Sequence, residues 1–325
     1  MKTLKIPENF QKVNFRNYVD ILSLDKTRSK TYRKQLYAFG RLLPKRFNEL
    51  ITQYKRQMNV SFSELSKQYS VSEKQMRAWR TGKTGIPLRA LNQLISELRI
   101  NPHSIQDLIE GLSSSRGSTI LIPRLISPTL VEILGRFCGD GSCGIYDGSN
   151  YKFSLKETNV NFVELHSQDM NSIFAIKGRV VHYHRVSENV IYSKPLVLLF
   201  QQLFKYKDGF QKSLHVKPPE LLDDLDWSLR KGFTTGLIDT EGSFYHDQST
   251  RTVIFEIKMI NSSLIQEVGK AFKEFDIHYN YFSFPKNKPM IFRIRSYGKK
   301  TLRLLKDVFE PKNQRHLNKF QSLRL

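Results

Sequence analysis

Two segments of this chain, about 100 residues apart, repeat one pattern, and this repeat constrains the fold more than any other feature. The first is residues 133–142, ILGRFCGDGS, and the second is residues 234–243, TTGLIDTEGS. Farther along, residues 153–159 and 255–261 coincide at Phe, Lys and Asn. A period of this length predicts two copies of one domain rather than a solenoid of short repeats.

Each copy is predicted to be an α+β unit with the element order αββαββα. A helix ends at the Gly-Ser pair, and runs with strand-like alternation follow, for example residues 151–155 and 253–259. A sheet in such a unit covers one face with helices and leaves the other free. We therefore expect two units, residues 127–222 and 223–325.

The first helix of each copy carries small residues four positions apart. These are Gly135 and Gly139 in the first copy and Gly236 and Thr240 in the second. Small residues at this spacing let two helix backbones approach closely, so the two copies can pack about a pseudo-twofold axis. The ends of the helices then converge.

Convergence of the helices would place two carboxylates side by side, because Asp140 and Glu241 precede the last glycine of each motif. Like charges at such range repel, and a bound divalent cation compensates. Mg²⁺ or Mn²⁺ is the expected ion. We expect it to be held by the two acids together with Gly139 and Thr240, the residues that precede them in the sequence. Such an ion could activate water for phosphodiester cleavage. The alternative is that both acids are solvated at helix C-termini, where the helix dipole disfavours carboxylates.

The charge of the chain points to a polyanionic partner. Lys and Arg total 52 against 30 Asp and Glu, for a net charge of +22. Nucleic acid is the leading candidate, and a basic protein without such a partner is the alternative. No apolar run approaches the roughly 18 residues that span a bilayer, so no membrane partner is expected. Two cysteines are too few for a disulfide framework, which fits a reducing, cytoplasmic location.

Residues 51–110 are predicted to be a DNA-binding domain. Ser61 and Glu64 have the spacing of a capping box, Ser72 and Gln75 repeat it, and Trp79 lies inward on the second helix. The stretch resembles the helix-turn-helix of the Cro and phage-repressor family, which implies that the helix from Glu73 lies in the major groove. An ordinary helical hairpin is the alternative. The expected DNA contacts are Lys74, Gln75, Arg77, Arg80 and Lys83.

Two flanking segments complete the expected N-terminal half, which is all-α. Residues 1–50 are interpreted as a basic helical segment that either contacts phosphates or forms the solvated face of supporting helices. Residues 111–126 begin with a small, polar, aperiodic stretch and are interpreted as a linker.

The doubled motif resembles the LAGLIDADG homing endonucleases over about 200 residues, from Pro128 to the C-terminus. Residues 235–242 match closely, whereas residues 134–141 depart at Arg136 and Cys138, where Leu and Asp are usual; these are packing positions. The resemblance implies a single-chain pseudo-dimer whose two curved sheets form a saddle on double-stranded DNA. It also implies that acids from both copies cut the two strands within a long recognition site.

The resemblance further implies a basic residue near the metals, late in each copy. The matching positions are Lys207 or Lys212 in the first and Lys312 or Arg315 in the second; the alternative for each is an ordinary phosphate contact or surface lysine. Outward-facing sheet residues are expected to read bases. They are Lys156, Arg179, Tyr183, Arg185, Lys258, Arg293 and Arg295.

The leading functional hypothesis is a monomeric, site-specific DNA endonuclease of the homing type, encoded in an intron or other mobile element and located with the nucleoid of a prokaryote. One alternative is a transcription regulator that keeps the scaffold for binding alone. Another is an intron maturase, against which the helix-turn-helix argues.

Overall fold

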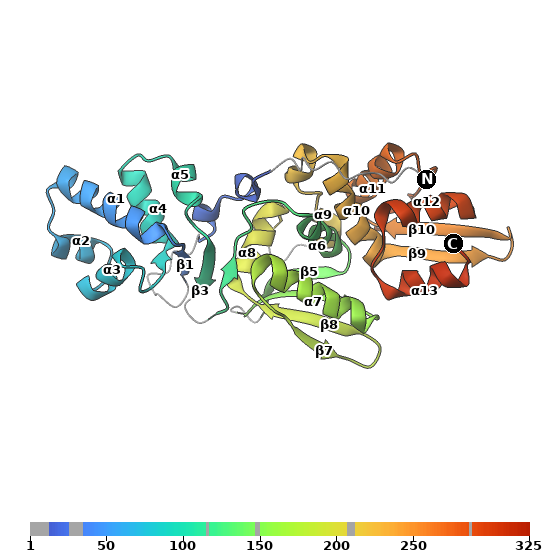
Figure 1. The fold of residues 1–325 in the computed structure, drawn as a ribbon, viewed down its shortest axis with the longest axis horizontal. Coiled ribbons are helices and arrows are strands. Elements are labelled where there is room, and N and C mark those ends of the chain that lie inside the picture. The colour runs from blue at the N-terminus through green and yellow to red at the C-terminus, as the bar shows by residue number, and fades with distance from the viewer. Residues whose placement is uncertain (1–12, 26–34, 115–116, 147–149, 207–211, 286–287) are drawn as a thin grey trace.

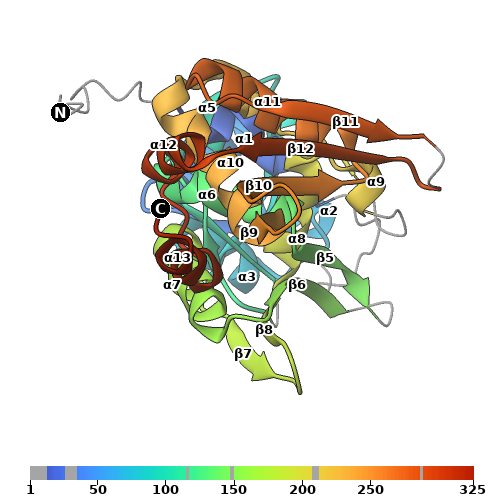
Figure 2. The same cartoon turned by 90° about the vertical axis from the view of Figure 1, so that its right-hand side faces the viewer.

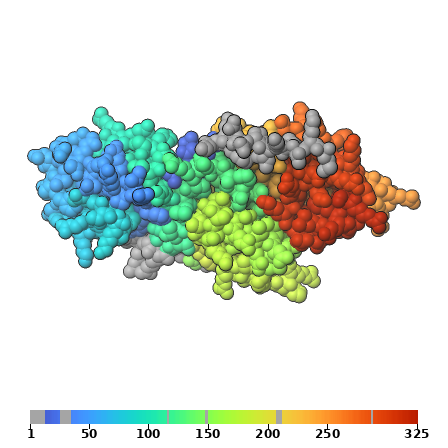
Figure 3. Space-filling view, viewed as in Figure 1, coloured from blue at the N-terminus to red at the C-terminus, as the bar shows by residue number. Residues whose placement is uncertain are grey.

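The computed structural model describes residues 13–25, 35–114, 117–146, 150–206, 212–285 and 288–325 (Figure 1). The molecule is elongated, with the N-terminal part, the first repeated unit and the second repeated unit following one another along its long axis (Figure 3). No helix within these described ranges is both long and apolar enough to cross a membrane.

The N-terminal part combines helices with a small sheet, so the all-α prediction for it is wrong. Its helices are α1 (Leu43–Met58), α2 (Phe62–Gln68), α3 (Glu73–Arg80), α4 (Leu88–Glu97) and α5 (Pro102–Gln106), preceded by 3-10 turns at Phe15–Tyr18 and Ile21–Ser23. Its strands are β1 (Leu36–Phe39), β2 (Ile86–Pro87), β3 (Gly111–Ser114) and β4 (Ile120–Leu121), in the order β2-β1-β3-β4.

Part of the segment predicted as a linker is strand β3, which pairs with β1 in register from Leu36–Ser114 to Phe39–Gly111. A Cβ on Gly111 would lie 2.3 Å from the Phe39 ring and 2.5 Å from the carbonyl oxygen of Ile120. Only glycine fits between these neighbours. Strands of four residues are too short to show the alternation that identifies a strand, and small polar residues are typical of linkers.

The predicted helix starts at Ser61 and Ser72 are confirmed. The Glu64 amide donates to Ser61 Oγ (3.1 Å) and the Ser61 amide donates to Glu64 Oε2 (2.7 Å), which completes a capping box. At the second start the Gln75 amide donates to Ser72 Oγ (3.2 Å). Buried Met76 and Trp79 fix α3 against the core, as the spacing predicts.

Residues 13–25 join the N-terminal part to the repeated units. Buried Gln106 donates through Nε2 to the carbonyl oxygens of Arg16 and Val19, each at 2.6 Å. On the other side, the Tyr18 hydroxyl donates to Asp224 Oδ2 (2.6 Å) and Gln202 Nε2 donates to the carbonyl oxygen of Asp20 (3.1 Å). This part of the segment predicted to be helical is therefore a packed connection.

Both repeated units have the predicted order αββαββα. The first contains α6 (Pro128–Cys138), β5 (Gly141–Tyr146), β6 (Asn150–Glu157), α7 (Val160–Phe174), β7 (Arg179–His182), β8 (Ser187–Tyr192) and α8 (Lys194–Leu203). A short helix α9 (Lys212–His215) and a 3-10 turn (Glu220–Asp224) follow. The second contains α10 (Trp227–Glu241), β9 (Gly242–Asp247), β10 (Thr252–Met259), α11 (Ser262–Glu274), β11 (Asn280–Phe284), β12 (Ile291–Tyr297) and α12 (Lys299–Phe309), with α13 (Gln314–Ser322) added.

Each unit forms one antiparallel sheet, ordered β5-β6-β8-β7 in the first and β11-β12-β10-β9 in the second. Phe153 and Leu155 of β6 are buried, whereas Lys156 on the other face is exposed. In Figure 2, helices α7, α12 and α13 lie to the left, the β5–β6 and β11–β12 hairpins extend to the right, and the β7–β8 hairpin extends downward. Each sheet thus keeps one face free of covering helices.

Helices α6 and α10 pack with their backbones in direct contact, as the small residues predict. A Cβ on Gly135 would lie 2.1 Å from the carbonyl oxygen of Phe233. A Cβ on Gly236 would lie 2.3 Å from the carbonyl oxygen of Glu132 and 2.6 Å from the amide nitrogen of Arg136. No side chain larger than hydrogen fits at either position without moving a helix.

Candidate active site at the ends of the paired helices

The C-terminal ends of α6 and α10 meet, and each carries one of the predicted acids. Glu241 is the last residue of α10, and Asp140 lies in the turn two residues after α6 ends at Cys138. A Cβ on Gly139 would lie 2.1 Å from Thr240 Oγ1 and 3.2 Å from Glu241 Cγ. The structure therefore brings together Asp140, Gly139, Thr240 and Glu241.

The environment of the two acids opposes their ionisation. Burial, then the charge of Glu241, then that of Glu157 raise the pKa of Asp140 to about 7, against the opposing effects of Arg315 and Lys212. Burial also raises the pKa of Glu241, and Lys212 and Arg315 again oppose the shift. Two carboxylates that are costly to ionise together are stabilised by a nearby cation.

The residues present fit a divalent cation with a preference for oxygen. The donors at the helix ends are carboxylate and carbonyl oxygens, which suit Mg²⁺ and Mn²⁺. In the described part of the chain, no three His, Cys, Asp or Glu side chains are grouped to hold a metal by themselves. Mg²⁺ commonly keeps several waters and binds one or two carboxylates together with phosphate oxygens of a substrate, so two acids are sufficient.

Lys212 lies at the end of α6. Its Nζ donates to the carbonyl oxygens of Phe137 (2.6 Å), Gly139 (2.7 Å) and Cys138 (3.2 Å), and also to that of Gly141. Burial is the main cause that lowers the pKa of Lys212, while Glu241 and Asp140 oppose it. A cation at this place satisfies the free carbonyls and the negative end of the helix dipole.

Arg315 has the corresponding place at the end of α10. Its Nη2 donates to the carbonyl oxygens of Thr240 (2.9 Å) and Asp239 (3.2 Å). The structure thus brings Lys212 and Arg315 to the acids. It also shows that the carbonyl oxygens of Gly139 and Thr240, expected beside the metal, accept hydrogen bonds from these two basic residues.

Lys312 does not reach the acids. Its Nζ lies 2.6 Å from Glu132 Oε2 and 2.8 Å from Oε1, on the side of α6 that faces the second unit. Glu132 precedes Asp140 by eight residues, which is about 12 Å along a helix. Lys312 therefore stabilises the contact between the units. The remaining candidate, Lys207, falls outside the described residues.

The departure of the first motif at Arg136 is accommodated by buried charge pairing. Arg136 is fully buried, and its guanidinium pairs with Glu132 Oε2 (2.9 Å) and Asp169 Oδ2 (2.6 Å). In the second unit, Asp239 occupies the position of Cys138 and accepts from the amides of Lys312 (2.8 Å) and Asn313 (2.9 Å). The side chains of Arg136 and Asp239 therefore stabilise the packing of the helices and do not take part in the candidate active site.

Five of the candidate base-reading residues lie on strands of the two sheets, and several of them are paired. Tyr183 and Arg185 were expected on a strand but lie in the turn between β7 and β8. Strand register places Lys258 opposite Arg293 and Glu256 opposite Arg295. Arg293 lies 3.4 Å from Glu256, Arg295 also donates to Glu256, and the Arg293 guanidinium stacks on Phe282 and Phe284. In the first unit the exposed side chains are Lys156, Arg179, Tyr183 and Arg185.

Helix α3 presents part of the predicted DNA-contacting set. On α3, Lys74 and Arg77 are exposed, and Gln75 is half-buried with Nε2 3.3 Å from Thr84 Oγ1. Lys83 is also exposed but lies beyond the end of α3. Arg80 instead donates through Nε to Asn48 Oδ1 and stacks on the Phe62 ring at 4.9 Å. Because both contacts hold α3 against α1 and α2, Arg80 is a packing residue here.

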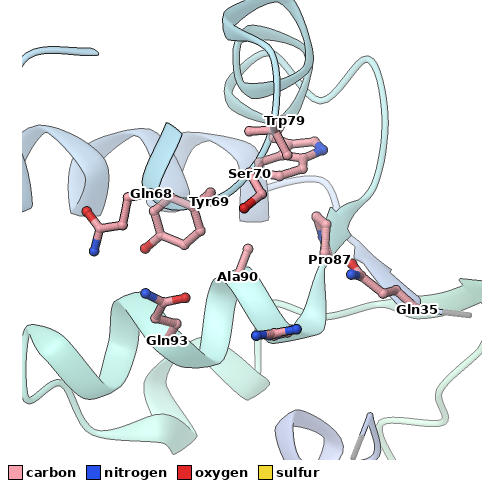
Figure 4. Close-up of a pocket in the computed structure, with 10 residues that line it drawn as sticks. Gln35, Gln68, Tyr69, Ser70, Trp79, Pro87, Ala90 and Gln93 are labelled. Atoms are coloured by element: carbon pink, nitrogen blue, oxygen red, sulfur yellow. The ribbon is translucent and has the colours of Figure 1, made fainter. Parts of the chain in front are cut away.

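Two hollows in the described structure differ in chemistry. One, of about 200 Å³, lies between the α2–α3 turn and α4 and is lined by Gln68, Tyr69, Trp79 and Gln93 among others (Figure 4). It has no carboxylate lining and contains none of the predicted DNA-contacting residues. The other, of about 210 Å³, is lined by Gly139, Glu241 and Lys258. Only the second places a carboxylate and a lysine together.

The raised pKa of Asp140 predicts an effect on stability in the absence of metal. The folded state holds this proton more tightly than the unfolded chain, so stability from this group is lost as pH rises from about 4 through about 7. Asp140→Asn should therefore melt higher than the wild type at pH 8 in EDTA, by a few degrees. The difference should vanish near pH 4. Asp247→Asn is the control, because hydrogen bonds from Ser249 and Thr250 lower the pKa of Asp247; stabilisation by this variant would contradict the interpretation.

Comparison with known proteins gives likenesses in structure only. No protein-family model and no curated protein match the chain. Variants of the homing endonuclease I-DmoI are 14% identical, cover 57% of this chain and 98% of their own, and give a TM-score of 0.43. The LAGLIDADG homing endonuclease I-GzeII in complex with its DNA target is 13% identical, with 60% and 87% covered and a TM-score of 0.39. The meganuclease I-SmaMI bound to uncleavable DNA is 10% identical, with 56% and 80% covered and a TM-score of 0.36.

Proposed function

We propose that this chain is a site-specific double-stranded DNA endonuclease of the homing type. The observation that carries the proposal is the contact between the ends of α6 and α10, where Asp140 and Glu241 lie together under the charges of Lys212 and Arg315. Two half-buried acids and two basic side chains at one point would form a site for a metal ion and a phosphate. The net charge of +22 supports a nucleic acid as the source of that phosphate.

Asp140 and Glu241 would hold Mg²⁺ or Mn²⁺, which supplies an activated water and stabilises the departing oxygen of the phosphodiester. Lys212 and Arg315 hold the last carbonyls of α6 and α10, which keeps the two acids in place. Their positive charge also lies where a scissile phosphate would bind. The chain's own contribution is thus positioning and charge.

The remaining parts of the chain would determine which DNA sequence is recognised. The two sheets would form a saddle over the major groove, with Lys156, Arg179 and Lys258 among the groups that reach bases or phosphates. Residues 51–110 would add a helix-turn-helix that anchors the enzyme on flanking DNA through α3. A single chain would suffice, because both acids belong to one molecule.

The test begins with DNA that the purified protein selects from a pool of random duplexes. A supercoiled plasmid carrying the selected site should be linearised with Mg²⁺ or Mn²⁺ and left intact with EDTA. A protein that binds the selected site but nicks neither strand with either metal would contradict the proposal and would favour the regulator alternative.

The role of α3 gives a separate prediction. Lys74→Ala combined with Arg77→Ala should weaken DNA binding and should lower the slope of log affinity against log salt by about 2, because two phosphate contacts are lost. Fluorescence anisotropy at several salt concentrations measures both quantities. Lys270→Ala is the control, because Lys270 is an exposed residue of α11, which packs on the covered face of its sheet. Equal effects from both variants would mean that α3 does not contact DNA.

A further inference from the structure

Glu157 is a buried carboxylate beside the candidate site that breaks the internal repeat. It ends strand β6, and only 3% of its side chain is exposed. The repeat aligns residues 153–159 with 255–261, so the residue at the same place in the second unit is Met259, which ends β10. The two halves of the site therefore differ by one carboxylate.

The contacts of Glu157 cross from the first unit to the second. Its Oε2 accepts from Asn313 Nδ2 (3.1 Å) and lies 3.5 Å from Arg315 Nη1. Its Oε1 accepts from the Thr158 hydroxyl (2.7 Å). Arg315 Nη2 also donates to the carbonyl oxygen of Thr240 (2.9 Å), the residue before Glu241. Glu157 and Thr240 therefore hold the Arg315 guanidinium from two sides.

Lys212 is held differently. Its hydrogen bonds go to carbonyl oxygens at the end of α6, and in the described part of the chain no carboxylate forms an ion pair with it. Met259 lines the hollow beside Glu241, where an acid would be needed to match Glu157. Arg315 carries a planar guanidinium that a carboxylate fixes in one orientation. Lys212 carries an ammonium that is surrounded by carbonyl oxygens. The two side chains therefore present their charges to a phosphate in different ways.

We propose that Glu157 is a positioning residue for Arg315, and that it makes the half of the site served by Arg315 unequal to the half served by Lys212. This inference rests on the proposed nuclease function. Glu157 fixes the guanidinium so that its charge faces the phosphate of one strand. Without that carboxylate the side chain can turn away, and small displacements of a charged group reduce rates strongly.

The test measures the nicking rate of each strand separately, on a plasmid with the selected site and with the two strands labelled differently. Glu157→Gln and Glu157→Met should slow one strand about tenfold and leave the other within about twofold. The ratio of the two rates comes from one protein preparation, so it does not depend on the fraction that is folded. An equal loss on both strands, or no change, would overturn the inference.

A double-mutant cycle tests whether Glu157 acts through Arg315. In an Arg315→Lys background, Glu157→Gln should change the ratio of the two nicking rates by less than about twofold, because the guanidinium that the carboxylate positions is no longer present. Additive effects would overturn the inference. Glu220→Gln is the matched control: it also removes a glutamate paired with a basic residue, Lys205, but both side chains are exposed, so the ratio should stay at its wild-type value.

The failure of this inference is distinguishable from the failure of the proposed function. A wild-type protein that cuts neither strand would overturn both. Cleavage of both strands by the wild type, with a strand ratio that Glu157→Gln does not change, would overturn the role of Glu157 alone.

Discussion

Asp140→Asn and Glu241→Gln should each abolish plasmid linearisation while leaving DNA binding nearly intact. Each change keeps the size of the side chain and removes one negative charge from the meeting point of α6 and α10. Loss of a metal-ligating carboxylate removes several kcal/mol of charge stabilisation, and each 1.4 kcal/mol is about tenfold in rate, so a loss of about 1,000-fold is expected.

The measurement is the rate of linear product in saturating Mg²⁺, with binding followed by anisotropy in Ca²⁺ or EDTA. Asp247→Asn serves as the control, because Asp247 is a hydrogen-bonded acid at the far end of β9 and should be dispensable. Linearisation at the wild-type rate by both acid variants would refute the assignment. Loss of binding together with cleavage would mean that the acids act through folding.

Gly236→Ala should destabilise the protein more than any surface change. The added Cβ would lie 2.3 Å from the carbonyl oxygen of Glu132 and 2.6 Å from the amide nitrogen of Arg136, and both are backbone atoms that cannot move without displacing α6. Overpacking of this kind costs about 3 kcal/mol or more, which lowers the melting temperature by roughly 6–12 °C.

Gly232→Ala is the matched control on the same helix. Its Cβ would lie 3.3 Å from the carbonyl oxygen of Pro128 and 3.4 Å from Val131 Cβ, so a small adjustment accommodates it. Alanine also favours the helical state by up to about 1 kcal/mol over glycine, which offsets part of the cost. Thermal melts followed by circular dichroism compare the two variants. Equal melting temperatures would show that α6 and α10 are not packed as described.

The repeat made the two units predictable, because small residues at a spacing of four and an acid at the end recur in both copies. Gly135, Gly236, Asp140 and Glu241 can be identified by comparing the chain with itself. Most strands of both sheets could be expected because they are long enough to alternate buried and exposed residues, as β6 does at Phe153 and Lys156.

Residues whose roles depend on long-range contacts could not be identified in this way. Lys312 and Arg315 are three apart and chemically alike in the sequence, yet one pairs with Glu132 and the other reaches the carbonyl oxygen of Thr240. Likewise, nothing in the sequence around Arg80 shows that Asn48 accepts from it. Glu157 is not among the residues predicted from the sequence, although its alignment with Met259 marks a departure from the repeat.

We propose that Asp140 and Glu241 together hold one divalent-cation site at the junction of α6 and α10. Electron paramagnetic resonance of Mn²⁺ titrated into the complex with selected DNA counts bound ions directly. The wild type should bind Mn²⁺ with an affinity that falls as pH drops below about 7, where Asp140 is protonated. The Asp140→Asn, Glu241→Gln double variant should lose that binding while still holding DNA, and an unchanged Mn²⁺ isotherm in the double variant would contradict the claim.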